Sequence, residues 1–99
     1  MKIEELLQRV VKEGASDGFI AADAAPAIKV DGQIHPISEH KLSDQEARDV
    51  VLSTMSEKQQ KEFLEHHECN FALGSEGLGR FRVSAFVQRG KCGLVLRRI

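Results

Sequence analysis

The sequence predicts an α+β fold in which helices lie beside an antiparallel β-sheet. Its predicted elements follow the order α-β-β-β-α-α-β-β-β, which contains no series of strand–helix–strand units of the kind that builds a parallel sheet. Two segments have the pattern of β-hairpins, and two serine-led motifs mark helix starts. With 99 residues, 41% of them hydrophobic and 29% charged, the chain is long enough for one folded domain with a single core.

The first two predicted elements are a short helix and a strand. Residues 3–13 predict an amphipathic helix, because their apolar side chains recur at helical spacing and Gly14 stands where a helix commonly ends. Residues 15–22 follow as a strand, which Gly18 weakens because glycine contributes no side chain to the packing of the sheet.

A β-hairpin is predicted next. Residues 26–30 and 33–37 are rich in strand-forming side chains and flank the dipeptide Asp31-Gly32. This dipeptide tolerates the positive φ angles that a two-residue hairpin turn requires. The segment therefore predicts two antiparallel strands joined by a tight turn.

Two helices follow the hairpin. Ser43-Asp-Gln-Glu46 and Ser56-Glu-Lys-Gln59 both fit the capping box, in which a serine and a Glu or Gln three residues later satisfy each other's backbone N–H groups. The first helix is expected to run to about residue 54 and the second to about residue 66. The side chains expected to face inward are Ala47, Val50, Val51, Phe63 and Leu64.

A strand at residues 68–73 and a turn at residues 74–77 lead into the last hairpin. If Arg89-Gly90 forms a two-residue turn, antiparallel pairing sets the register of the strands that it joins. One face then pairs Val87 with Cys92, Ala85 with Leu94, Val83 with Leu96 and Phe81 with Arg98. Because most of these pairs are apolar, this face is predicted to lie against the core. The opposite face pairs Ser84 with Val95, Phe86 with Gly93 and Arg82 with Arg97.

The last hairpin also concentrates positive charge. Residues 80–99 contain six Lys or Arg and no acid, whereas the first 79 residues contain all 15 acids and eight Lys or Arg. Like charges directly opposite on a ladder repel, so a pairing of Arg82 with Arg97 favours an anion or an acidic partner over this face. The alternative is that these arginines only solvate an exposed strand face and protect it from aggregation.

Other classes of site have weaker support in the sequence. Nucleic-acid binding is disfavoured, because the rest of the chain is acidic and carries no recognisable binding module. Cys69 and Cys92 lack a metal-type pair spacing and are expected to be reduced thiols. A metal site at His66, His67 and Cys69 is disfavoured, since adjacent histidines point to different sides of a helix. No signal peptide, membrane span or complete set of catalytic residues is evident.

Six motifs, in this order and spacing, resemble the N-terminal domain of type IV pilus retraction ATPases of the PilT/PilU family, within the hexameric secretion ATPase superfamily. They are Gly14-Ala-Ser-Asp17, Ile28-Lys-Val-Asp-Gly32, Met55-Ser-Glu-Lys-Gln59, His67-Glu-Cys-Asn-Phe71, Gly79-Arg-Phe-Arg-Val-Ser-Ala-Phe86 and Leu94-Val-Leu-Arg-Arg98. The resemblance extends over the whole chain.

Several positions refine this resemblance. Phe19, where PilT-like proteins usually have histidine, and His67-Glu-Cys-Asn70 resemble the PilU branch more than the PilT branch. Two departures from the family pattern occur close together: Gly18 replaces the usual leucine, and Ala22-Asp-Ala-Ala25 lacks the usual glycine and first proline.

The resemblance implies a PAS-like α+β fold for residues 1–99 as a single N-terminal domain. It implies that a RecA-like ATPase domain, with the phosphate loop, follows residue 99 in a cytoplasmic homo-hexameric motor that uses ATP and Mg²⁺. The 99 residues alone are then expected not to be an enzyme. The implied partners are the protein's own RecA-like domain, neighbouring subunits and the pilus inner-membrane machinery, with a PilT-type motor as a further candidate; no nucleic acid and no membrane insertion is expected.

The resemblance also assigns a site. Two arginines of the family's N-terminal domain reach the nucleotide phosphates, and they match Arg82 and Arg97 of this sequence. No catalytic residue is expected within the 99 residues themselves, and no metal site. The alternative function is a stand-alone PAS-like sensing or interaction module that uses the arginine-rich hairpin as a docking edge.

Overall fold

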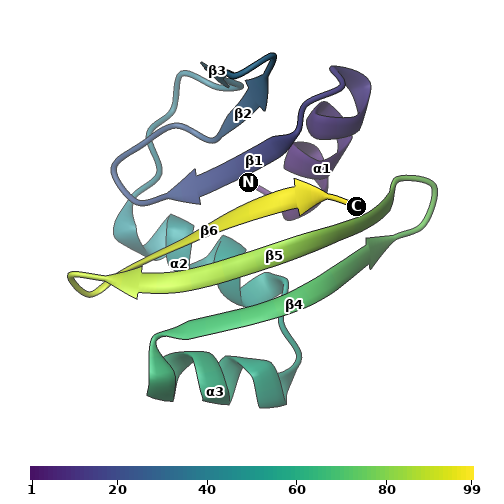
Figure 1. Cartoon of the computed structure of the whole chain (residues 1–99). Coiled ribbons are helices and arrows are strands. Elements are labelled where there is room, and N and C mark those ends of the chain that lie inside the picture. The colour runs from purple at the N-terminus through teal and green to yellow at the C-terminus, as the bar shows by residue number, and fades with distance from the viewer.

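The last strand of the chain lies in the middle of the sheet. In the computed structural model, which describes all 99 residues, six strands form one antiparallel sheet in the order β3-β2-β1-β6-β5-β4, with three helices beside it (Figure 1). The elements are α1 (Ile3–Lys12), β1 (Asp17–Ala21), β2 (Ala27–Val30), β3 (Gln33–Pro36), α2 (Asp44–Ser53), α3 (Glu57–His66), β4 (Glu68–Ser75), β5 (Gly79–Gln88) and β6 (Lys91–Arg98). Their order and the α+β class confirm the sequence prediction.

The helices leave one face of the sheet uncovered. Helix α1 contacts β1 and β2, α2 contacts β6 and β1, and α3 contacts β4. In Figure 1, α1 and α2 lie behind the sheet and α3 lies beside its β4 edge, so the viewer sees the face that no helix covers. We call it the open face. Each helix has ten residues, and none is long and apolar enough to cross a membrane.

The hairpin of β5 and β6 has the predicted register. Arg89 and Gly90 form its turn with φ angles of 54° and 77°, the positive values that a two-residue turn of this hand needs at both positions. The seven predicted cross-strand pairs are all present. An arginine in this conformation costs roughly 1 kcal/mol of backbone strain, so the pairing of the two strands must outweigh it.

This register divides the side chains of β5 and β6 between the core and the open face. Five of them are at most 2% exposed: Phe81, Val83, Ala85, Leu94 and Leu96. They pack against the apolar sides of α1 and α2, whose buried residues are Ile3, Leu6, Leu7, Val10, Ala47, Val50 and Val51. Complete burial of one large apolar side chain stabilises a fold by about 1.5–3 kcal/mol. The last hairpin is therefore a main contributor to the core.

Both predicted helix starts are capping boxes. The Ser43 hydroxyl accepts a hydrogen bond from the backbone N–H of Glu46, and the Ser56 hydroxyl accepts one from the backbone N–H of Gln59, with the reciprocal bonds also present. The backbone N–H of Ser43 and the ring of His40 both hydrogen-bond the Glu46 carboxylate and lower its pKa to about 2. These local bonds explain why the starts could be predicted from the sequence.

Two details of the prediction are wrong. Leu64 is 42% exposed and does not face inward, because α3 covers only the edge strand β4 and Phe63 is the one side chain of α3 that is buried. Gly74 and Ser75 belong to β4 and not to a turn, since both pair with the start of β5. The ladder therefore extends two residues farther than the turn-forming composition of this segment indicated.

The two departures from the family pattern lie in β1 and in the loop after it. A Cβ atom on Gly18 would stand 3.1 Å from Leu96 Cδ1, so a leucine at this position would require the core to repack. The loop after β1 is held through Leu42, whose backbone N–H donates to the Ala24 carbonyl and whose own carbonyl accepts from the Asp23 N–H. These two backbone hydrogen bonds hold the loop after β1 in place.

Gly93 yields a test of the close packing on the open face. A Cβ atom there would stand 2.8 Å from the Phe86 ring and 3.0 Å from the carbonyl oxygen of Ile20, which belongs to the neighbouring strand. We expect Gly93→Ala to lower the free energy of unfolding by about 1–3 kcal/mol, measured by urea denaturation.

Gly74→Ala is the matched control for this substitution. Gly74 also lies in a strand, and a Cβ atom on it would meet nothing within 4 Å. We expect its effect to stay within about 0.5 kcal/mol. Equal destabilisation by the two substitutions would contradict the close packing of Gly93.

Candidate functional site

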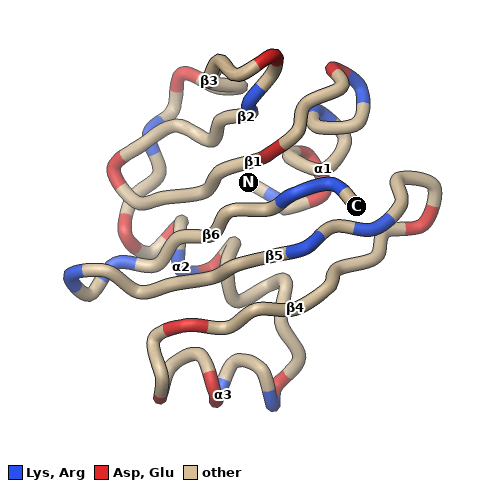
Figure 2. The backbone as a smooth tube through the Cα atoms, in the orientation of Figure 1, with Lys and Arg blue, Asp and Glu red and all other residues tan.

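The open face brings four charged side chains into one row across the sheet. The ladder pairs Lys29 with Asp17, Asp17 with Arg97, and Arg97 with Arg82. Side chains directly opposite on a ladder share a face, with Cβ atoms about 5 Å apart. Figure 2 shows the basic positions of β5 and β6 side by side, with the acidic position of β1 next to them.

The predicted arginine pair occupies the centre of this row. Arg82 and Arg97 are both exposed, and 75% of the Arg97 side chain is accessible to solvent. The prediction that they share a face is thereby confirmed. Their contact with nucleotide phosphates stays a prediction.

Asp17 is a member of the row that sequence reasoning missed as a site residue. It is only 6% exposed, although it lies on the open face. Its carboxylate accepts a hydrogen bond of 2.8 Å from the Ser16 hydroxyl and one of 3.1 Å from Nε of Arg97. The register of β1 against β6 would have revealed the pair, but the two residues are 80 positions apart in the sequence.

The surroundings of Asp17 keep it ionised. Burial of the carboxylate acts to raise its pKa. The hydrogen bonds from Ser16 and Arg97, together with the positive charges of Arg97 and Lys29, outweigh burial, and the pKa of Asp17 lies below its ordinary value. Asp17 is therefore a carboxylate that neutralises part of the positive charge of the row.

The row retains an excess of positive charge. Arg82 makes no ion pair and no side-chain hydrogen bond within the chain, and Asp17 is the one carboxylate that pairs with Arg97. Guanidinium groups stay protonated at any physiological pH and bind phosphate oxygens in a planar fork. Because two like charges lie side by side, an anion bound over them would relieve their repulsion. The arrangement suits a ligand that carries phosphate.

Apolar side chains adjoin these charges on the same face. Phe19 of β1 pairs with Val95 of β6, and Phe86 of β5 lies over Gly93. Phe19, Val95 and Phe86 are half-buried and are covered by no helix. The open face thus combines cations with a partly exposed apolar patch.

The thiols and histidines considered from the sequence are not drawn into this site. Cys69 and Cys92 are free thiols, and burial raises the pKa of both, so they stay protonated and are poor nucleophiles. His67 ends α3 with a left-handed φ of 64° and donates its backbone N–H to the Phe63 carbonyl. The chain has no group of three or more His, Cys, Asp or Glu side chains that could hold a metal ion.

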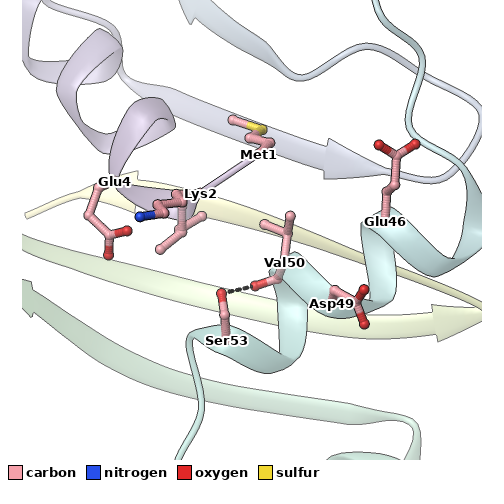
Figure 3. Close-up of a pocket in the computed structure, with 8 residues that line it drawn as sticks. Met1, Lys2, Glu4, Glu46, Asp49, Val50 and Ser53 are labelled. Atoms are coloured by element: carbon pink, nitrogen blue, oxygen red, sulfur yellow. Dashed lines mark hydrogen bonds between the residues drawn. The ribbon is translucent and has the colours of Figure 1, made fainter.

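A surface hollow of about 400 Å³ lies elsewhere, between the start of α1 and helix α2 (Figure 3). Three carboxylates line it, those of Glu4, Glu46 and Asp49, against one lysine, Lys2. None of its lining residues belongs to the row of charges on the open face. Its negative charge disfavours an anionic ligand, in contrast to the row of charges on the open face.

The ionisation of Asp17 predicts a dependence of stability on pH. Because its pKa is lower in the folded state than the ordinary value of 3.8, the charged carboxylate stabilises the fold above about pH 4. That stabilisation is lost as the pH falls through the folded-state pKa. We expect Asp17→Asn to lower the melting temperature at pH 7, and the difference from wild type to shrink below about pH 3, as followed by circular dichroism.

Asp49→Asn, which changes an exposed carboxylate on α2, is the control and should show no comparable loss at pH 7. A difference between wild type and Asp17→Asn that stays constant from pH 7 to pH 2.5 would contradict the role of the charge.

Comparison with known proteins finds relatives of this domain. No family model matches the chain. Over all 99 residues it is 50% identical to the type IV pilus ATPase PilU of Pseudomonas aeruginosa and 38% identical to the type IV pilus retractation ATPase PilT of the same organism. It is 30% identical, over 85% of its length, to a twitching motility protein of Neisseria gonorrhoeae. The chain spans 26%, 29% and 22% of the lengths of these three relatives.

Solved structures share its fold. All of the chain matches 29% of a crystal structure of the pilus retraction motor PilT with bound ADP, with a TM-score of 0.90 and 34% identity. The ATPase DotB of Legionella pneumophila matches 98% of the chain over 28% of its own, with a TM-score of 0.81 and 22% identity, which shows a shared fold alone. By its sequence along all 99 residues and by its PAS-like α+β fold, the chain belongs to the PilT/PilU family of type IV pilus ATPases, as an N-terminal domain more similar to PilU than to PilT.

Proposed function

We propose that this chain is the N-terminal domain of a cytoplasmic type IV pilus retraction motor of the PilU kind, which acts in twitching motility. The observation that carries the proposal is the 50% identity to PilU along every residue of the chain. The fold shared with the PilT motor supports it. In this proposal a RecA-like ATPase domain binds and hydrolyses ATP, and the present domain completes the nucleotide site.

Arg82 and Arg97 carry this role. Both guanidinium groups are exposed, share one face and lie on neighbouring central strands, so the sheet holds their backbones rigidly. As the terminal phosphate of ATP is transferred, charge spreads over its oxygens and over the leaving phosphate. Two permanent cations directed at those oxygens stabilise the transition state more than the ground state. The domain supplies no base and no nucleophile in this mechanism.

The open face is the surface that meets the motor domain of a neighbouring subunit in a homo-hexamer. Phosphate binding alone would need only the cations, whereas Phe19, Phe86 and Val95 leave apolar area exposed beside them. A protein surface that closes over this face would bury the apolar area and exclude water from the arginines, which strengthens their attraction for phosphate. The pilus inner-membrane machinery, and a PilT-type motor, are the further partners proposed.

Mg²⁺ accompanies ATP in the proposed motor. The residues of this chain do not fit the ion, because no cluster of three or more potential ligands exists and the row of charges on the open face contains a single carboxylate among cations. We therefore assign no step to this chain through the metal.

One prediction of the proposed function concerns the 99-residue chain alone. Two arginines and one flanking lysine on an open surface hold a triphosphate only weakly, so we expect a Kd for ATP of about 1 mM or weaker and no measurable ATP hydrolysis. Isothermal titration calorimetry and a phosphate-release assay measure the two quantities. A micromolar Kd for ATP would show that the chain contains a nucleotide site of its own.

Another prediction of the proposed function concerns the full-length motor. We expect Arg82→Ala and Arg97→Ala each to lower the ATPase turnover of assembled hexamers by about tenfold or more, the scale of loss when a phosphate-stabilising guanidinium is removed. Steady-state phosphate release, with thermal melts to verify folding, gives the measurement.

Arg98→Ala is the matched control. Arg98 is exposed and adjacent to Arg97 on β6, but it pairs with Phe81 and so points to the other side of the sheet. We expect the turnover of this variant to stay within about twofold of wild type. Wild-type turnover in both the Arg82 and Arg97 variants would favour the alternative in which these arginines only solvate an exposed strand face.

A further inference from the structure

Asp17 is the one buried carboxylate of the chain, and it lies outside the hydrophobic core. Its side chain is 8% exposed, whereas its partner Arg97 is 75% exposed. Removing a carboxylate from water is unfavourable unless bonds compensate for it. The folded domain therefore keeps a desolvated, negatively charged Asp17 carboxylate next to an exposed Arg97, and the bonds to that carboxylate must compensate for the loss of its hydration.

The bond between the two residues has a specific geometry. Asp17 accepts from Nε of Arg97, at 3.1 Å, and the two Nη groups of Arg97 make no hydrogen bond within the chain. An acceptor at Nε restrains the rotation of the guanidinium plane while leaving the outer N–H groups available. The carboxylate therefore restrains Arg97 without occupying the part of the fork that a phosphate would use.

Further contacts hold the carboxylate itself in place. The Ser16 hydroxyl donates to the other carboxylate oxygen at 2.8 Å, and Asp17 pairs through its backbone with both β2 and β6. Lys29, on the far side of Asp17 in the row, adds a second positive charge. Arg82 has no equivalent restraint, since no carboxylate pairs with it.

We infer that Asp17 is a positioning residue, which holds the Arg97 guanidinium at Nε so that its Nη groups are oriented for the nucleotide phosphates before the nucleotide binds. This inference rests on the proposed function. Orienting the group in advance avoids the entropic cost of fixing a long side chain at the moment of reaction. Arg97 is then the pre-oriented arginine of the pair, and Arg82 is the one that orders on binding.

A double-mutant cycle in the full-length motor tests the inference. We expect Asp17→Ala to lower kcat/KM for ATP about 3–10-fold, less than Arg97→Ala does, because the guanidinium is still present but no longer oriented. In the Arg97→Ala background, Asp17→Ala should have no further effect, because Asp17 acts only through Arg97. Asp49→Ala, which removes an exposed carboxylate on α2 outside the row of charges, is the control and should leave kcat/KM within about twofold of wild type.

The outcomes separate this inference from the proposed function. The positioning role of Asp17 would be overturned by additive losses from Asp17→Ala and Arg97→Ala, or by an Asp17→Ala motor that is as active as wild type. Neither result would affect the proposed role of Arg97 at the phosphates. Wild-type activity of the Arg97→Ala motor would overturn both. Asp17→Asn, which retains an oxygen acceptor for Nε, should fall between wild type and Asp17→Ala, and it serves where the alanine variant does not fold.

A measurement on the 99-residue chain is independent of catalysis. By NMR we expect the Nε–H proton of Arg97 to exchange with water at least about tenfold more slowly than that of Arg82, because it is hydrogen-bonded to a buried acceptor. Asp17→Ala should bring the two exchange rates together. Equal exchange rates of the two Nε–H protons in the wild-type chain would show that Asp17 does not restrain Arg97, and would overturn the inference.

Discussion

The structure depends on the insertion of β6 between β1 and β5. This strand pairs with β5 along its whole length and with β1 from Gly93 to Arg97, and so joins the N-terminal strands to the β4–β5 hairpin. Without it the sheet would divide into one three-stranded piece, β3-β2-β1, and one two-stranded piece, β5-β4, that could not share a core. The same insertion buries Leu94 and Leu96 between the helices and the sheet, so the last residues of the chain are central to its stability.

One strand serves the core and the candidate site together. Along β6, Leu94 and Leu96 face the helices, and Arg97 lies on the open face. Because side chains alternate between faces with a period of two, a slip of one residue would bury the arginine and expose the leucines. The burial of the core therefore fixes the position of the site. The φ angles of Arg89 and Gly90 define the start of that register.

The charges of the open face follow from the same pairing. Three cations and one carboxylate lie in a row, and the carboxylate is the only buried member. If a carboxylate lay beside each arginine, the positive charge of the two guanidinium groups would be neutralised. If the row contained no carboxylate at all, neither arginine would be restrained. A single buried Asp17 orients one guanidinium and leaves a net positive field for an anion.

The sequence by itself determined the local features of this domain. Capping boxes at Ser43 and Ser56 and the Arg89-Gly90 turn depend on residues within a few positions, so their patterns specify them directly. The face shared by Arg82 and Arg97 followed from that turn. Tertiary structure decided what depends on distant contacts: Leu64 is exposed because α3 reaches only an edge strand, and Asp17 meets Arg97 because β1 pairs with β6 across 80 positions. No local pattern encodes which strands will be neighbours, since that choice minimises the exposed apolar area of the whole chain.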